Sequence, residues 1–179
     1  MNYKPRYWYH SNIKFSSEEL DKLKFEIDTI GSEKQSKDKK HVTTFFLSPN
    51  QKPEDKYKNI YSSIVEDITK NVGIYYKTKY LFSYWLQLYD KNMMHRAHHH
   101  ADVDDNLDTI ISWVHFIDVP KQKLFRFTDT TGNFFVPEEQ NEGDIICFPS
   151  WVWHEVLPNN SNERRVVLAG NITVTHYDD

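Results

Sequence analysis

The stretch Trp85-Leu-Gln-Leu-Tyr-Asp-Lys-Asn-Met-Met-His-Arg-Ala-His-His-His-Ala-Asp102 is the most informative segment of this 179-residue chain. Three consecutive histidines and an aspartate stand within its last five positions. In an extended strand, residues two apart share a face, so His98, His100 and Asp102 are expected to point one way and His99 the other. Two of these groups, joined by the distant His154, would form the set of two histidines and one carboxylate that holds iron(II) and leaves coordination sites open.

Two simpler explanations of the histidine tract are a solvated, histidine-rich loop and a structural zinc site. A structural zinc site normally has four protein ligands, with thiolates among them. The chain has one cysteine, Cys147, which disfavours such a site. A catalytic metal is therefore a hypothesis that the downstream residues must support.

Length and composition predict one domain, residues 1–179, that is long enough to bury a real core. The net charge of -4 and the pI of about 6.1 give no reason to expect nucleic acid or an anionic membrane surface as a partner. The sequence has no apolar run of membrane-spanning length and no signal-peptide pattern, and its single cysteine fits a reducing interior. We expect a cytoplasmic protein, with no indication of its oligomeric state.

Residues 1–79 are expected to form a support region with two helices. Ser16 and Glu19 match a capping box at the start of the first helix, and Gly31 would end it. The second helix is expected to begin after Pro53 and to end at Gly73. Short strands are expected near residues 7–9 and over residues 42–47.

From Tyr80 onward the hydrophobic period changes from helical to that of short strands. Turn residues, for example those around Gly132 and Gly143, separate the candidate strands. These strands are 80–89, 109–117, 123–127, 134–136, 144–148, 152–156 and 165–175. Short strands with close turns favour a β-sandwich or jelly roll, so the expected fold class is mainly β with flanking helices (α+β).

Four segments of this region together resemble the iron(II)/2-oxoglutarate-dependent oxygenases, and especially the small prolyl-4-hydroxylase-like members of bacteria and their phages. The segments are the His98–Asp102 tract, the strand Ser112–Pro120, the run Glu142–His154 with its Gly-Asp-x-x-x-Phe-Pro-Ser-Trp pattern, and Arg165–Asn171. The resemblance implies a double-stranded β-helix (jelly roll, cupin-like) core over residues 80–176, with the two N-terminal helices packed on one face. It also implies Fe(II), 2-oxoglutarate as cosubstrate, and O2.

The resemblance assigns a role to Arg165, which would anchor the distal carboxylate of 2-oxoglutarate. The planar guanidinium suits such bidentate contact with a carboxylate. Asn171 and Gln87 are further candidates for holding the cosubstrate. No role is assigned to several other histidines, among them His41, His95 and His115.

The first two metal ligands can be chosen in two ways. The spacing that most members of the resembled family show after the residues equivalent to Trp85 and Tyr89 implies the pair His98 and His100. The spacing of longer-looped prolyl hydroxylases, counted back from Ser112, implies the pair His100 and Asp102. The preferred set is His100, Asp102 and His154, because a carboxylate partly neutralises the charge of the metal. His98 is then the alternative first ligand, and a set of three histidines is chemically acceptable to iron.

The function that the resemblance implies is hydroxylation of a C–H bond, in a small molecule or in a protein side chain such as proline. Two other classes remain open on the sequence alone. One is a three-histidine, cupin-like dioxygenase that does not use 2-oxoglutarate. The other is a non-catalytic β-sandwich that acts as a binding module.

Overall fold

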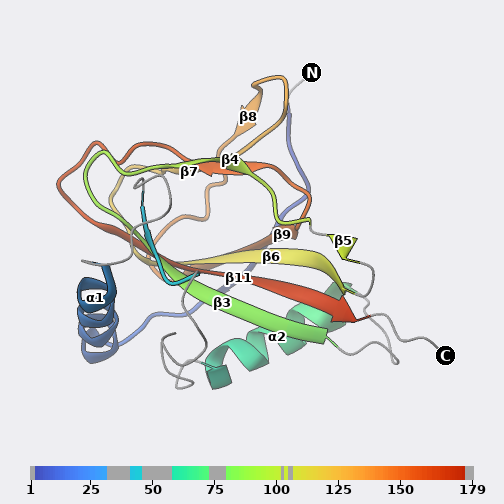
Figure 1. Cartoon of the computed structure of the whole chain (residues 1–179), viewed down its shortest axis with the longest axis horizontal. Helices are drawn as coiled ribbons and strands as arrows, with labels where there is room; N and C mark the ends of the chain where they lie inside the picture. Colours follow the sequence, from blue (N-terminus) through green and yellow to red (C-terminus); the bar gives the residue numbers. More distant parts are fainter. Residues whose placement is uncertain are drawn as a thin grey trace.

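Two facing β-sheets and two helices make up the computed structural model, which describes residues 3–31, 41–45, 58–72, 80–101, 103–104 and 107–175 (Figure 1). The larger sheet has the order β1 (Trp8–Asn12), β9 (Asp144–Pro149), β6 (Leu107–Asp118), β11 (Arg165–Thr175), β3 (Tyr80–Tyr89) and β2 (Val42–Thr43), and β5 (Val103–Asp104) pairs with β6. The smaller sheet has the order β4 (His95–His98), β10 (His154–Val156), β7 (Phe125–Thr128) and β8 (Phe134–Phe135). Each of these strand pairs is antiparallel.

The helices and the smaller sheet lie on opposite sides of the larger sheet. Figure 1 shows helix α2 (Lys58–Val72) below the larger sheet and strands β4 and β7 above it. Helix α1 (Ser17–Gly31) contributes Leu23 to the same buried cluster as the apolar face of α2. The expected mainly β fold with two helices on one face is confirmed.

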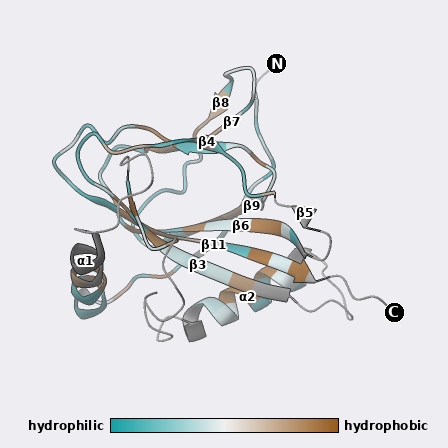
Figure 2. Cartoon of the chain, in the orientation of Figure 1, coloured by the Kyte–Doolittle hydropathy of each residue, from teal (hydrophilic) through white to brown (hydrophobic). Residues whose placement is uncertain are grey.

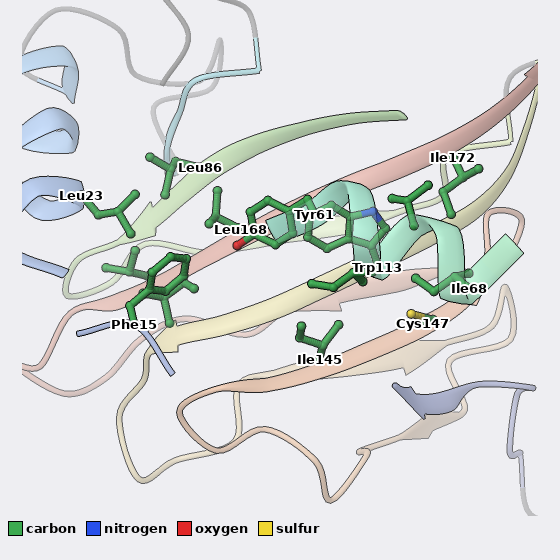
Figure 3. Close-up of a cluster of buried hydrophobic side chains, with 14 of the residues drawn as sticks. Phe15, Leu23, Tyr61, Ile68, Leu86, Trp113, Ile145, Cys147, Leu168 and Ile172 are labelled. Atoms are coloured by element: carbon green, nitrogen blue, oxygen red, sulfur yellow. The ribbon is translucent and has the colours of Figure 1, made fainter. Parts of the chain in front are cut away.

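Strict alternation along the strands gives the larger sheet two apolar faces. On β11, Val166 and Leu168 join the helix-side cluster, whereas Val167 joins a second cluster between the sheets. Figure 3 shows the helix-side cluster, in which Tyr61 of α2 stacks on Trp113 of β6 at 4.8 Å between ring centroids. The odd-numbered residues at the start of β11 therefore face the space between the two sheets.

The N-terminal signals of the first helix behave as their sequence predicts. The Ser16 backbone N–H donates to the Glu19 carboxylate at 2.8 Å, and the Glu19 N–H donates to the Ser16 hydroxyl at 3.3 Å, which completes a capping box. The expected strand 42–47 is too long: β2 covers only Val42–Thr43, residues 44–45 form a bend and a turn, and residues 46–47 lie outside the described residues. The expected start of the second helix after Pro53 also lies outside the described residues.

The strand expected near residues 7–9 is longer than predicted and has a clear structural role. As β1 it pairs with β9 and closes one edge of the larger sheet. Neither of the two described helices is long and apolar enough to cross a membrane.

Candidate metal centre

Three of the predicted site histidines come together between the two sheets. His98 ends the edge strand β4 and stands opposite His154, which begins β10. His100 follows β4 and is held by a hydrogen bond from its backbone N–H to the carbonyl of Ser150 at 2.8 Å. The nitrogen atoms that His98, His100 and His154 offer to a metal all lie within 4.8 Å of one another. His99 is exposed and its ring meets Trp153 edge-on at 4.7 Å between centroids.

Each of the three imidazoles is oriented by a hydrogen bond at Nδ1. His98 Nδ1 donates to the carbonyl of Arg96 at 2.8 Å, and His154 Nδ1 donates to the carbonyl of Val152 at 3.0 Å. His100 Nδ1 lies 2.8 Å from Oδ1 of Asn171. An oxygen that can only accept requires the proton on Nδ1, so each Nε2 keeps its lone pair for a metal. Such outer hydrogen bonds are the usual support of metal-binding histidines.

The environment keeps His98 and His154 in the neutral form that a metal requires. Burial, followed by the neighbouring histidines, lowers the pKa of His98 to about 4 and that of His154 well below its ordinary value. These two histidines can therefore bind a divalent cation at neutral pH without first releasing a proton.

Arg165 lies in the same pocket and has an incomplete set of contacts. It begins β11 and pairs across to Tyr89 of β3. Its side chain is only 2% exposed, and among the described residues neither Nη1 nor Nη2 has a hydrogen-bond partner. Instead, the guanidinium lies over the rings of Tyr89 at 4.9 Å and Phe116 at 5.6 Å. Burial lowers its pKa to about 10, so at neutral pH it remains a buried cation that requires an anion.

A pocket of about 350 Å³, part of it open to solvent, joins Arg165 to the three histidines. Its wall includes Phe125, Phe148 and Val156, which supply an apolar surface. The pocket thus combines a candidate metal-binding cluster with a guanidinium whose Nη1 and Nη2 have no hydrogen-bond partner in the described part of the chain, which fits a chelating ligand with a distal carboxylate.

Gln87 and Asn171, the other two residues expected to hold a cosubstrate, form hydrogen bonds to side chains of the protein. Gln87 is buried, lines the pocket, and accepts a hydrogen bond from the Tyr89 hydroxyl at 2.9 Å. Asn171 contacts His100 and also accepts a hydrogen bond from the Ser112 hydroxyl at 2.9 Å. Asn171 therefore orients a candidate metal ligand, and contact of either residue with a cosubstrate stays a prediction.

Asp102, the carboxylate of the preferred ligand set, lies outside the described residues. The described cluster contains His98, the alternative first ligand, together with His100 and His154. The expected coordination of a metal by Asp102 stays a prediction.

Two histidines to which the sequence assigned no role stand beside the cluster. The rings of His95 and His98 stack at 4.0 Å, and those of His41 and His95 lie 4.2 Å apart. His95 and His98 are three residues apart, which in a regular strand would place them on opposite faces. A register shift between β4 and β10 inserts one extra residue and turns both rings to one side. The sequence carries no signal for that bulge.

Comparisons with known proteins agree with this site. Residues 128–171 match the family model described as "Putative 2OG-Fe(II) oxygenase". The match includes His154, Arg165 and Asn171. No curated protein sequence matches the chain.

Solved structures cover almost the whole chain at low identity. A Pseudomonas putida prolyl-4-hydroxylase has a TM-score of 0.62 and 17% identity, over 97% of this chain and 92% of that one. The 2-oxoglutarate-dependent carbocyclase SnoK from nogalamycin biosynthesis has a TM-score of 0.65 and 10% identity, over 96% and 80%. A prolyl hydroxylase from Trichoplax adhaerens, solved with a peptide fragment of hypoxia inducible factor, has a TM-score of 0.59 and 12% identity, over 93% and 82%.

These matches bear out the expected double-stranded β-helix fold, and they do not bear on the expected likeness to phage members. The resemblance drawn from the motifs is confirmed: residues 128–171 match the 2OG-Fe(II) oxygenase family model, and the chain has the fold of solved 2-oxoglutarate-dependent oxygenases.

Proposed function

We propose that this protein is a non-haem iron(II)- and 2-oxoglutarate-dependent dioxygenase that hydroxylates a C–H bond. The observation that carries the proposal is Arg165, a buried cation with both terminal nitrogens unpaired among the described residues, in one pocket with His98, His100 and His154. A metal cluster alone would suit many enzymes. A guanidinium beside that cluster with no anion on it among the residues that the structure describes favours a cosubstrate with a distal carboxylate, such as a diacid.

Separate groups of residues would hold the metal, bind the cosubstrate and exclude water. The Nε2 atoms of His98, His100 and His154 would hold the iron, with Asp102 still a candidate ligand. Arg165 would bind the distal carboxylate of 2-oxoglutarate through Nη1 and Nη2. The apolar wall of Phe125, Phe148 and Val156 would exclude water from the cosubstrate. Iron with 2-oxoglutarate and O2 would supply the oxidising chemistry.

The substrate class stays open between two kinds of molecule. The Trichoplax adhaerens enzyme was solved with a peptide, and SnoK belongs to nogalamycin biosynthesis. We therefore propose either a protein side chain such as proline or a small molecule as substrate. We also propose that the protein acts in the cytoplasm.

Equilibrium dialysis of 2-oxoglutarate under anaerobic conditions tests this function without a known substrate. The wild-type protein should bind 2-oxoglutarate tightly only when Fe(II) is present, because the keto acid end needs the metal and the distal end needs Arg165. His154→Ala should lose Fe(II) binding and, with it, the metal-dependent binding of 2-oxoglutarate. Binding of 2-oxoglutarate that does not depend on Fe(II) would contradict the proposal.

A second candidate is the three-histidine dioxygenase without 2-oxoglutarate, which the cluster of His98, His100 and His154 favours. It predicts Fe(II) binding without metal-dependent binding of 2-oxoglutarate, and turnover that Arg165→Ala leaves intact. A non-catalytic module would bind neither ligand in the same dialysis.

A further inference from the structure

A column of four adjoining rings, stacked at its two ends and tilted in the middle, runs from the guanidinium of Arg165 to the candidate metal ligand His98. Its members are Tyr89, His41, His95 and His98, with successive ring centroids 5.3, 4.2 and 4.0 Å apart. The first ring, Tyr89, also carries the Arg165 guanidinium on its face at 4.9 Å. The column therefore joins the two ends of the pocket in which the proposed cosubstrate would lie.

Three separate parts of the chain build this column. Tyr89 ends β3, and His41 stands directly before β2, whose residue Val42 pairs with Leu88 of β3. His95 comes from β4, where the bulge against β10 turns it to the same side as His98. His95 also faces the Tyr89 hydroxyl, with its Nδ1 at 3.5 Å from that oxygen. Residues from the N-terminal region thus back the edge strand that carries a candidate ligand.

His98 lies on a weakly paired edge strand, so its ring needs contacts from other parts of the chain to keep its orientation. Strand β4 is an edge strand among the described residues, paired only with β10, and the bulge weakens that pairing. The hydrogen bond to the carbonyl of Arg96 holds His98 at one atom only and comes from the same bulged strand. Stacking on His95 holds the face of the ring, which a single hydrogen bond leaves free to turn.

We propose that His95, backed by His41 and Tyr89, is a positioning residue that holds the His98 ring by stacking in the orientation that metal binding requires. The inference rests on the metal centre of the proposed function. Its essential feature is a flat ring at position 95, and not a nitrogen ligand from His95, which lies outside the group of three converging histidines.

Two substitutions of similar volume separate these roles. His95→Phe keeps a flat ring without nitrogen atoms, whereas His95→Leu fills the space without a flat face. The full-length protein is titrated with Co(II), and binding is followed by the visible absorption of the bound metal. We expect the Co(II) dissociation constant to rise about 10-fold in His95→Leu and to stay within about 3-fold of wild type in His95→Phe. His99→Ala, in the same tract but turned outward, serves as the control and should bind Co(II) like wild type.

Each result decides between the roles. Unchanged affinity in His95→Leu would overturn the inference while leaving the metal centre in place. Equal weakening in both variants would show that His95 acts through its nitrogen atoms, which also overturns it. Absence of Co(II) binding by the wild-type protein would overturn the proposed metal centre, and the inference with it. Melting temperatures of the metal-free variants show whether a loss of binding comes from unfolding.

Discussion

Replacement of Arg165 by methionine should change stability and cosubstrate binding in opposite directions. In the ligand-free protein Arg165 is 2% exposed, and its guanidinium lies over the rings of Tyr89 and Phe116 without an ion-pair partner among the described residues. An unpaired buried charge costs several kcal/mol, of which cation–π contacts return roughly 0.5–2 kcal/mol each. Arg165→Met should therefore stabilise the ligand-free protein by roughly 1–3 kcal/mol. In a chain of this size that raises the melting temperature by roughly 2–12 °C.

The same substitution should weaken 2-oxoglutarate binding at least 100-fold. Removing one partner of a buried, hydrogen-bonded ion pair costs about 3–5 kcal/mol, because the remaining charge has no counterion. At a 2-oxoglutarate concentration 100 times the wild-type dissociation constant, the ligand stabilises the wild-type protein by about 2.7 kcal/mol. The same concentration should stabilise Arg165→Met by only about 0.4 kcal/mol.

Thermal unfolding of the Mn(II)-loaded protein, with and without 2-oxoglutarate, measures both effects. The matched control is Arg164→Met, because Arg164 is part-exposed and pairs with Asp90 at 2.9 Å. That surface pair contributes about 0–1 kcal/mol, and its loss should leave the 2-oxoglutarate effect intact. An Arg165→Met protein that is several degrees less stable without ligand, and that still responds to 2-oxoglutarate like wild type, would show that Arg165 is neither an unpaired buried charge nor the residue that binds the cosubstrate.

Three further predictions concern packing, pH and ligand orientation. In urea titrations, Gly170→Ala should lower the free energy of unfolding by more than about 3 kcal/mol, because the new Cβ would lie 2.2 Å from the Trp113 ring. Gly132→Ala should lower it by only roughly 1–2 kcal/mol, because the new Cβ has open space around it and the cost comes from the positive φ of 88° alone. Burial lowers the pKa of His115 from 6.5 to about 4, so the unfolded chain binds a proton that the folded one does not, and stability should fall as the pH drops from 6.5 to 4. His115→Phe should remove up to about 1.4 kcal/mol per pH unit from that slope, and an unchanged slope would contradict the assignment. Asn171→Ala should weaken Co(II) binding roughly 10- to 100-fold, because it removes the hydrogen bond that orients His100. Unchanged Co(II) binding would show that the Asn171 amide does not orient this ligand.

The sequence predicted the parts of the site that depend on local periodicity. The alternation of residues two apart placed His98 and His100 on one side and His99 on the other, as the structure shows. The same alternation accounts for the part-exposed Arg164 beside the buried Arg165. Both features need only the geometry of an extended strand.

The stacked column could not be predicted, because it depends on two non-local events. One is the bulge between β4 and β10, which reverses the expected face of His95. The other is the pairing of β2 with the end of β3, which brings His41 across from a distant part of the chain. The sequence around His98 contains no pattern that predicts either the bulge or this strand pairing.

A crystal structure of the protein with Mn(II) and N-oxalylglycine, a 2-oxoglutarate mimic, would show whether the three histidines and Arg165 form one site for a metal and a diacid. We expect an anomalous metal peak at roughly 2 Å from Nε2 of His98, His100 and His154. We also expect the distal carboxylate of the mimic on Nη1 and Nη2 of Arg165. A metal bound away from the three histidines, or a mimic whose carboxylate does not contact Arg165, would show that no such site exists.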